Sequence, residues 1–240
     1  MSGEPGLGDD LRASGRVSVS IVVPAYNEGA IVRDTLSRLT TQFPEAEIVV
    51  VSDGCVDDTC AIVRSFSEHA TLLDYKPNRG KGHAVRTGVL AAHGEVVLFT
   101  DADLPFGTAG VERLLEEFER RPDADVVIAE KTGAYRSRGY RAARAGVRLG
   151  VRWLLGLDQG DTQAGLKGFR RRAARVIFTQ AVIDGFAADM EVLAIAAREG
   201  LRVVGVPLPV VNDGARPSTF TPRQGVRLMR DVWAIRRRLC

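Results

Sequence analysis

Short runs of β-branched apolar residues alternate with amphipathic segments through the first half of this 240-residue chain. The runs have the length of buried strands, and the segments between them repeat their apolar residues at helical spacing. Strands are predicted at 17–24, 48–51, 71–73, 96–100 and 126–129, and helices at 31–39, 59–66, 84–92 and 111–118. This order predicts βαβ units, and therefore an α/β fold with a mostly parallel sheet flanked by helices.

The second half of the chain is less regular. Its pattern predicts helices at 138–157, 170–180, 187–198 and 222–239, a strand at 202–211, and a loop with a short strand at 161–169. No internal repeat or low-complexity linker divides the sequence. We therefore expect a single domain over residues 17–240, preceded by a flexible lead of residues 1–16.

Composition excludes several classes of protein. With 45% hydrophobic and 26% charged residues, the chain is expected to fold around a core rather than to stay disordered. No run of 18 apolar residues is free of charge, so no membrane-spanning helix is predicted. Three cysteines, an odd number, in a sequence without an apolar signal segment indicate a reducing, cytoplasmic location.

Basic residues gather in two segments. Residues 131–157 hold seven basic residues and no acidic one, and residues 220–240 hold six arginines against Asp231. An anionic partner such as a membrane surface would suit these segments, and solvated helix faces are the alternative. Because both segments are poor in aromatic rings on which bases could stack, we expect no nucleic-acid partner.

Polar residues follow four successive predicted strands. They lie at 24–28, at 52–54 with Asp57 and Asp58, at 78–83 and at 101–103. In open parallel sheets, ligands bind beyond the carboxyl ends of the strands. Loop chemistry or helix capping explains any one of these groups, whereas all four together predict a site at one edge of the sheet.

The chemistry of this site is indicated by Asp101, Asp103 and Lys81. Two carboxylates together with phosphate oxygens suit Mg²⁺ or Mn²⁺, and such an ion would neutralise a departing diphosphate. Lys81 stands in a glycine-rich segment that is neither a P-loop nor a dinucleotide fingerprint, because Gly82 and Val85 occupy positions where those motifs need other residues. ATP hydrolysis by a P-loop is therefore disfavoured, but Lys81 can still neutralise phosphate.

Four segments of the first half, 21–28 (IVVPAYNE), 50–59 (VVSDGCVDDT), 78–88 (NRGKGHAVRTG) and 98–103 (LFTDAD), resemble the nucleotide-sugar half of family 2 glycosyltransferases. Two later segments, 161–171 (DTQAGLKGFRR) and 185–196 (GFAADMEVLAIA), are similar to the polyprenyl- and dolichyl-phosphate sugar transferases, and to the dolichyl-phosphate β-glucosyltransferase branch more than to the mannose synthase branch. The resemblance implies a GT-A fold over 17–240, with a nucleotide-sugar half at 17–130 and an acceptor half at 131–240.

The resemblance also implies roles for individual residues. A nucleotide sugar would contact Pro24, Tyr26, Glu28, Asp53, Lys81, Asp101, Ala102, Asp103, Gln163, Arg216 and Arg223. Residues 165–168 would line the sugar together with Gln163. Asp101 and Asp103 would handle the metal and diphosphate, and Asp189 and Glu191 would be the further catalytic carboxylates near the acceptor. The acceptor phosphate would contact Arg136, Arg138 and Arg141.

We therefore expect a metal-dependent inverting glycosyltransferase that moves a hexose from a nucleotide sugar to a polyprenyl or dolichyl phosphate. UDP-glucose is favoured over GDP-mannose, because Leu104 and Pro105 follow the aspartate pair where mannose synthases often carry a glutamine. The protein is expected in the cytoplasm, in peripheral contact with the inner face of the membrane. A glycosyltransferase acting on a soluble acceptor such as a secondary metabolite, and a carbohydrate-binding module without activity, stay open as alternatives. The oligomeric state is not predicted.

Overall fold

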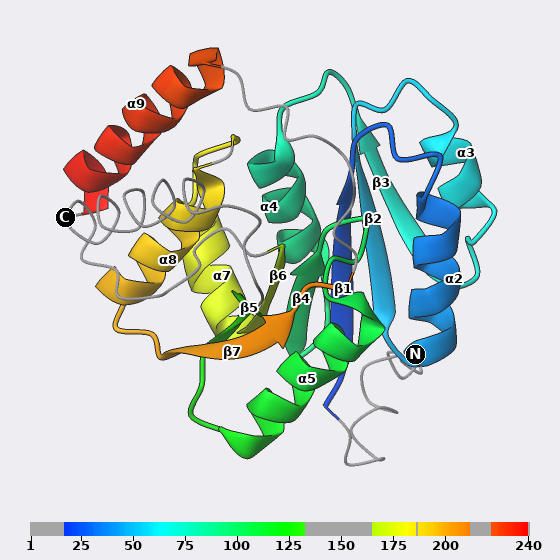
Figure 1. The fold of residues 1–240 in the computed structure, drawn as a ribbon, viewed down its shortest axis with the longest axis horizontal. Coiled ribbons are helices and arrows are strands. Elements are labelled where there is room, and N and C mark those ends of the chain that lie inside the picture. Colours follow the sequence, from blue (N-terminus) through cyan, green and yellow to red (C-terminus); the bar gives the residue numbers. More distant parts are fainter. Residues whose placement is uncertain (1–16, 133–164, 186, 212–221, 240) are drawn as a thin grey trace, which may run out of the picture.

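The computed structural model of the chain describes residues 17–132, 165–185, 187–211 and 222–239. In these residues a seven-stranded sheet is covered by helices on both faces (Figure 1), which confirms the predicted α/β fold with a mostly parallel sheet. The predicted lead at 1–16 and the predicted basic helix at 138–157 lie outside the described residues.

The sheet has the strand order β3-β2-β1-β4-β6-β5-β7. Its strands are β1 (Val19–Ala25), β2 (Glu47–Asp53), β3 (Ala70–Tyr75), β4 (Val96–Thr100), β5 (Val126–Thr132), β6 (Leu166–Arg170) and β7 (Val203–Pro209). Among the described strands, only β6 runs antiparallel to its neighbours, β4 and β5. All five strands predicted in the first half are present, with ends that differ by at most three residues.

The described helices are α2 (Val32–Gln42), α3 (Thr59–Arg64), α4 (Lys81–Ala91), α5 (Gly107–Arg120), α7 (Arg171–Gln180), α8 (Ala188–Arg198) and α9 (Pro222–Leu239). Their buried apolar residues recur at helical spacing, as in α5, where Val111, Leu114 and Phe118 are buried. Helices α2 and α5 cover one face, α4, α7 and α8 cover the other, and α9 packs on α8 (Figure 1).

The direction of β6 decides which residues meet at the functional edge of the sheet. Because β6 is antiparallel to β4, its first residues lie beside the carboxyl end of β4, and the backbone N–H of Asp101 donates to the carbonyl of Gly165 at 3.0 Å. We call this edge, where β1 to β4 end and β6 begins, the rim. The rim joins the first half of the chain to the segment after residue 164.

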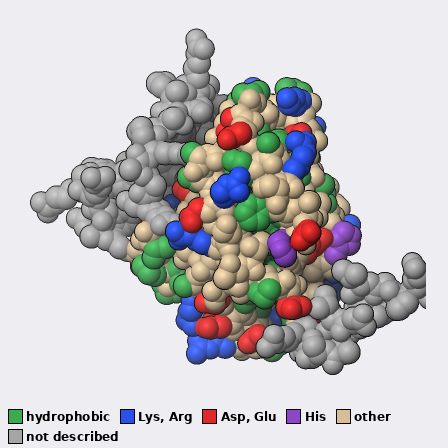
Figure 2. Space-filling model, turned by 90° about the vertical axis from the view of Figure 1, so that its right-hand side faces the viewer, with side chains coloured by type: hydrophobic (Ala, Val, Ile, Leu, Met, Phe, Trp, Pro, Cys, Tyr) green, Lys and Arg blue, Asp and Glu red, His purple; other side chains and the backbone are tan. Residues whose placement is uncertain are grey.

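The side of the molecule that carries α2 and α3 is shown in Figure 2. Acidic and basic side chains are interspersed over this face, as on an ordinary solvated surface. Within the described ranges, no helix has both the length and the apolarity needed to cross a bilayer.

Candidate active site

Asp101 follows β4 at the rim, where its carboxylate meets a cation from a neighbouring helix. Lys81, the first residue of α4, places its Nζ 2.5 Å from Asp101 Oδ1, and each of the two side chains is 34% exposed. The other carboxylate oxygen faces Gly165, where an added Cβ would lie 2.1 Å from Asp101 Oδ2. A glycine is therefore required beside Asp101 if the carboxylate is to keep this position.

The turn after Asp101 presents the second predicted metal ligand. Ala102 is buried, and its carbonyl accepts a hydrogen bond from the hydroxyl of Thr35 in α2. Leu104 has a left-handed backbone, with φ of 46°, and its N–H donates to the Asp101 carbonyl at 3.0 Å. In this tight turn, Asp103 is exposed although it directly follows the buried Ala102. Both predicted metal ligands thus belong to one short, well-anchored turn.

Lys81 is a cation among three carboxylates. Burial alone would lower the pKa of Lys81, but the charges of Asp101, Asp189 and Asp103 outweigh it and raise the pKa well above its ordinary value. Lys81 is therefore protonated at any physiological pH. A fixed positive charge at the rim is what a diphosphate leaving group needs.

Asp53 supports the backbone that leads into Lys81. It lies buried at the end of β2, where its Oδ1 accepts from the Tyr75 hydroxyl at 2.8 Å and from the Arg79 N–H at 2.7 Å. Its Oδ2 accepts from the Gly80 N–H at 2.8 Å. Burial and the hydrogen bond to Asp53 raise the pKa of Tyr75. The structure thus shows Asp53 ordering the segment before α4, and its predicted contact with the nucleotide stays a prediction.

A second support for this segment comes from the connection between α7 and α8. The Gly82 N–H donates to the Asp184 carbonyl at 2.9 Å, and Asp184 Oδ1 lies 2.7 Å from Arg86 Nη2. Arg79 Nη2 lies 3.4 Å from Asp184 Oδ2. Sequence reasoning missed Asp184, because nothing near it in the sequence signals a partner about a hundred residues away.

His83 belongs to the same group of residues. Its Nδ1 lies 2.8 Å from Arg86 Nη2, and its ring meets the Tyr75 ring edge-on, with centroids 5.0 Å apart. Burial, followed by the charge of Arg79, lowers the pKa of His83, although Asp184 acts in the opposite direction. A neutral ring that accepts a hydrogen bond from Arg86 fits this environment.

Asp189, predicted to act near the acceptor, lies in the first turn of α8 and is paired with a buried lysine. Lys167 Nζ of β6 lies 2.7 Å from Asp189 Oδ1, and the Lys167 side chain has no exposed surface whereas that of Asp189 is 16% exposed. The ammonium group of Lys167 also lies 5.3 Å from the centroid of the Phe99 ring. Asp189 can therefore reach solvent at the rim, while its counter-ion is inside the domain.

Glu191, the other acidic residue predicted near the acceptor, is buried. Its carboxylate accepts hydrogen bonds from the N–H groups of Val182 and Ile183, the shortest at 2.8 Å, and pairs with Arg238 of α9. A carboxylate used in this way holds the connection between α7 and α8 and the end of α9. We therefore assign Glu191 a supporting role, and the predicted role of Asp189 near the acceptor stays a prediction.

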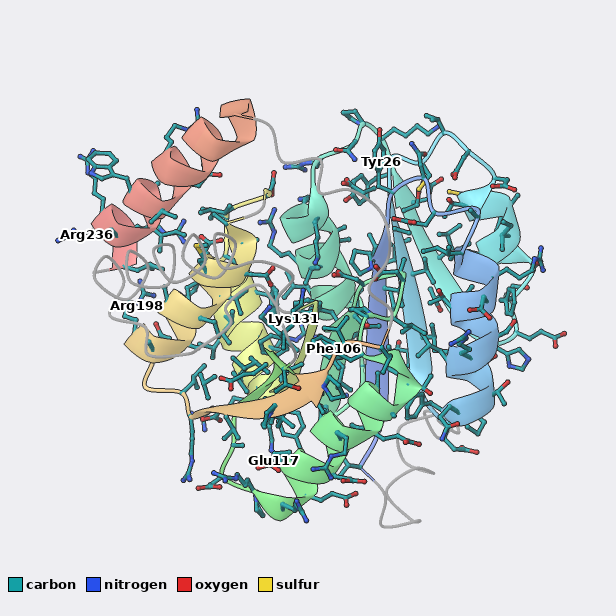
Figure 3. The ribbon with its side chains drawn as sticks, in the orientation of Figure 1. Tyr26, Phe106, Glu117, Lys131, Arg198 and Arg236 are labelled. Atoms are coloured by element: carbon teal, nitrogen blue, oxygen red, sulfur yellow. The ribbon has the colours of Figure 1, made fainter. Side chains whose placement is uncertain are left out.

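The remaining predicted residues are placed as follows. Tyr26 is exposed where β1 ends, and Figure 3 shows it at that edge of the molecule. Pro24 is the penultimate residue of β1, and the N–H of Glu28 donates to Thr59 Oγ1 at 2.8 Å. Five predicted residues lie outside the described ranges: Arg136, Arg138, Arg141, Gln163 and Arg216. Arg223 lies in the first turn of α9.

Comparison with known proteins identifies the family. Residues 20–182 match the model of glycosyl transferase family 2. The chain belongs to that family. This confirms the predicted enzyme class, a glycosyltransferase, and the resemblance on which the sequence analysis relied.

Curated members of family 2 resemble most of the chain. A dolichyl-phosphate β-glucosyltransferase of Dictyostelium discoideum is 29% identical over 97% of this chain and 78% of its own length. Another, from Trichomonas vaginalis, is 33% identical over 80% of this chain, which spans 63% of that relative. The chain thus spans less than two thirds of the second relative.

Solved structures show the same fold. A crystal structure of glucosyl-3-phosphoglycerate synthase from Mycobacterium tuberculosis, in complex with Mn²⁺, UDP-glucose and phosphoglyceric acid, superposes with a TM-score of 0.69. It is 21% identical, and the alignment covers 98% of this chain and 84% of that one. A structure of the same enzyme with Mg²⁺ and UDP has a TM-score of 0.68 at 21% identity, over 98% of this chain and 83% of that one. These matches confirm the predicted GT-A fold.

Proposed function

We propose that this glycosyltransferase moves a hexose, with inversion at the anomeric carbon, from a nucleoside diphosphate sugar to the phosphate of a polyprenyl lipid. The observation that carries the proposal is the ion pair of Lys81 and Asp101 at the rim, beside Asp103 and Asp189. Cleavage of the donor leaves a diphosphate, whose growing negative charge needs preorganised cations. Lys81, anchored through Asp53 and Asp184, supplies one of them.

A divalent ion would supply the second positive charge. Asp101 and Asp103 offer the oxygen ligands that Mg²⁺ and Mn²⁺ prefer, and the glycine at 165 leaves the space that Asp101 Oδ2 occupies. Among the described residues, no three side chains of His, Cys, Asp or Glu lie close enough together to hold a metal ion by themselves. Two carboxylates completed by donor phosphates and water are the usual pattern for Mg²⁺. When bound, the ion would act as a Lewis acid on the leaving diphosphate.

The acceptor proposed for the reaction is already ionised. A phosphate monoester carries between one and two negative charges at neutral pH, with a second pKa of about 6, so it can attack without a strong general base. The work left for the protein is to position the two substrates and to neutralise the leaving group. The curated relatives act on dolichyl phosphate, as their names state, and this supports a polyprenyl phosphate as acceptor.

A lipid acceptor also requires contact with a membrane, and the outer side of α9 offers a suitable surface. Val232 and Ile235 are buried under the helix, whereas Trp233 is 60% exposed on it, with the Arg237 guanidinium 5.7 Å from its ring. An exposed tryptophan among arginines is typical of helices that lie on anionic bilayers. Co-sedimentation with vesicles of anionic lipid, compared with vesicles of neutral lipid, tests this contact. Equal recovery with both would contradict it.

One experiment tests the function as a whole. The purified chain is incubated with Mn²⁺ and either UDP-glucose or GDP-mannose, with a polyprenyl phosphate as acceptor, and the anomeric configuration of the product is read by NMR. We expect a β-linked product from the α-linked UDP-glucose, and no product from the Asp103→Asn variant at unchanged Tm. Absence of any transfer to the polyprenyl phosphate, with both donors, would contradict the proposal.

A soluble phosphorylated acceptor is the second candidate. It is supported by the solved structures of similar fold, in which the acceptor molecule is phosphoglyceric acid. Replacing the polyprenyl phosphate by a small phosphate monoester in the same assay separates the two candidates. A higher kcat/KM with the small phosphate monoester would favour a soluble acceptor. A higher kcat/KM with the polyprenyl phosphate would favour the lipid acceptor.

A further inference from the structure

Lys167 is a fully buried cation that the proposed reaction does not use. It lies in β6, between β4 and β5, at a position where strands of this sheet otherwise carry apolar residues such as Phe99 and Ile128. Burying an ammonium group is costly unless it is paired. Lys167 Nζ pairs with Asp189 Oδ1 at 2.7 Å. A buried cation whose counter-ion reaches the rim calls for an explanation beyond the stability of the core.

The charge of Asp189 also acts on a second cation, Lys81. Helices α4 and α8 touch at their first turns, since a Cβ on Gly82 would lie 2.5 Å from the Cβ of Ala188. The neighbours of these two contact residues are Lys81 and Asp189. After Asp101, the charge of Asp189 has the largest favourable effect on protonated Lys81. Asp189 thus pairs with the buried Lys167, and its charge also acts on Lys81 at the rim.

We propose that Lys167 is a positioning residue that neutralises Asp189 and so leaves Lys81 directed to Asp101 and to the donor diphosphate. The inference rests on the proposed function, because it takes Lys81 as the ligand of the diphosphate. Without Lys167, the unpaired charge of Asp189 would attract Lys81 across the contact between α4 and α8. The buried lysine therefore acts on donor binding through a second lysine, without touching the donor.

The alternating charges explain why a lysine rather than an apolar residue occupies this position. Asp101 pairs with Lys81 and Asp189 pairs with Lys167, so the four side chains carry charges of alternating sign. Charges interact strongly in a medium of low dielectric constant. Removing the charge of Lys167 therefore changes which cation Asp189 attracts. Removal of Asp189 and Lys167 together leaves Lys81 with the partner it has in the structure.

The test is a double-mutant cycle on nucleotide binding, measured by isothermal titration of UDP in the presence of Mn²⁺. Lys167→Met is expected to weaken UDP binding about 10-fold in the wild-type background and less than about 2-fold in the Lys81→Met background, because both substitutions act on the same contact. Lys167→Met combined with Asp189→Asn is expected to bind UDP within about 2-fold of the wild type. A purely structural role would lower Tm without this dependence on Lys81.

Arg170→Met is the matched control, since Arg170 ends the same strand and packs on the Phe118 ring, away from the rim. It should lower Tm and leave the UDP dissociation constant unchanged. Equal losses from Lys167→Met in both backgrounds would overturn the inference. If Lys167→Met does not fold, binding by the Lys167→Met, Asp189→Asn protein decides: a loss of about 10-fold overturns the inference, and near-wild-type binding supports it. If wild-type protein binds neither UDP nor GDP, the proposed function fails instead.

Discussion

Asp184 Oδ1 lies 2.7 Å from Arg86 Nη2, and this contact ties the connection between α7 and α8 to the helix that begins with Lys81. His83 lies within the same cluster, 3.5 Å from Asp184 Oδ1. The segment that carries Lys81 is therefore positioned by residues from both halves of the chain. Substitutions in this cluster should therefore alter the position of Lys81 at the rim.

The first prediction concerns pH. Burial lowers the pKa of His83 below its ordinary value of 6.5, so the unfolded chain binds this proton more readily than the folded one. The contribution of His83 to stability is therefore complete above pH 6.5 and is lost as the pH falls from 6.5 through the folded-state pKa. His83→Asn should flatten the dependence of Tm on pH between about 7 and 5.

The control for this prediction is His69→Asn, because His69 is exposed at the end of the loop before β3. Thermal unfolding of wild type and both variants is followed over the same pH range. A His83→Asn protein with the wild-type slope would contradict the prediction.

The second prediction concerns the glycine beside Asp101. In Gly165→Ala the new methyl group would lie 2.1 Å from Asp101 Oδ2, so the carboxylate has to move away from its place beside Lys81. We expect a loss of activity of about 100-fold, since small displacements of reacting groups are costly. Gly200→Ala, at a left-handed glycine with open space around it, should reduce Tm slightly and keep full activity. Similar kinetics for both variants would show that the place of Asp101 is not critical.

The third prediction separates support from catalysis at Glu191. Glu191→Gln weakens the pair with Arg238 and places a buried amide N–H₂ group against the N–H groups of Val182 and Ile183, which should lower the free energy of unfolding by about 2 kcal/mol. Well below its Tm, the variant should keep most of its kcat. Glu199→Gln, at an exposed position after α8, is the control and should change neither quantity. Loss of kcat without loss of stability would return Glu191 to the catalytic residues.

The fourth prediction concerns the anchor at Asp53. In Asp53→Asn one side-chain oxygen becomes an amide N–H₂ group that faces the backbone N–H of Arg79 or Gly80, and a buried donor is left unpaired. We expect a loss of stability of about 2 kcal/mol, and faster amide exchange at 79–81. Asp57→Asn, which weakens a comparable but exposed hydrogen bond from Gly29, is the control. Unchanged exchange at 79–81 would contradict the assigned role of Asp53.

The fifth prediction uses Asp189 to identify the acceptor. If the acceptor is a phosphate, Asp189 accepts no proton, and the neutral Asp189→Asn variant should keep kcat with a phosphate ester within about 10-fold. With a hydroxyl acceptor the same variant should lose at least about 100-fold, because proton transfer by a placed base contributes that much. Rates with both kinds of acceptor decide the matter. A large loss with the phosphate ester would show that Asp189 acts in another way.

Much of the first half was predictable because its signals are local. Apolar runs marked β1 to β5 to within three residues, and the change from strand to polar turn marked Asp53 and Asp101 as rim residues. Parallel strands share one edge, so residues that follow them must gather there. The pairing of Lys81 with Asp101 itself was not predicted, since local sequence does not state which side chains from different strand ends touch.

In the described part of the second half, α7, α8, β7 and α9 also agree with the predicted ranges to within two residues, but the partners of β6 were not predicted. The pattern of β6 indicated a short strand, but only the tertiary structure shows that it enters the sheet antiparallel between β4 and β5 and brings Gly165 to Asp101. Lys167 gave no signal of its own in the sequence. A buried lysine is recognised as such only when its surroundings are known.

The sequence by itself determined the fold class, the family and the two carboxylates that follow β4, because short-range periodicity and a contiguous motif suffice for these. Tertiary structure alone decided that Asp189 reaches the rim, whereas Glu191 is buried and binds the connection between α7 and α8 and the end of α9. Only one residue separates the two. Positions two residues apart lie on different faces of a helix, and which face is buried depends on neighbours far away in the sequence. Ion pairs such as that of Lys167 with Asp189 follow from that packing, because a buried charge is costly unless the fold places an opposite charge beside it.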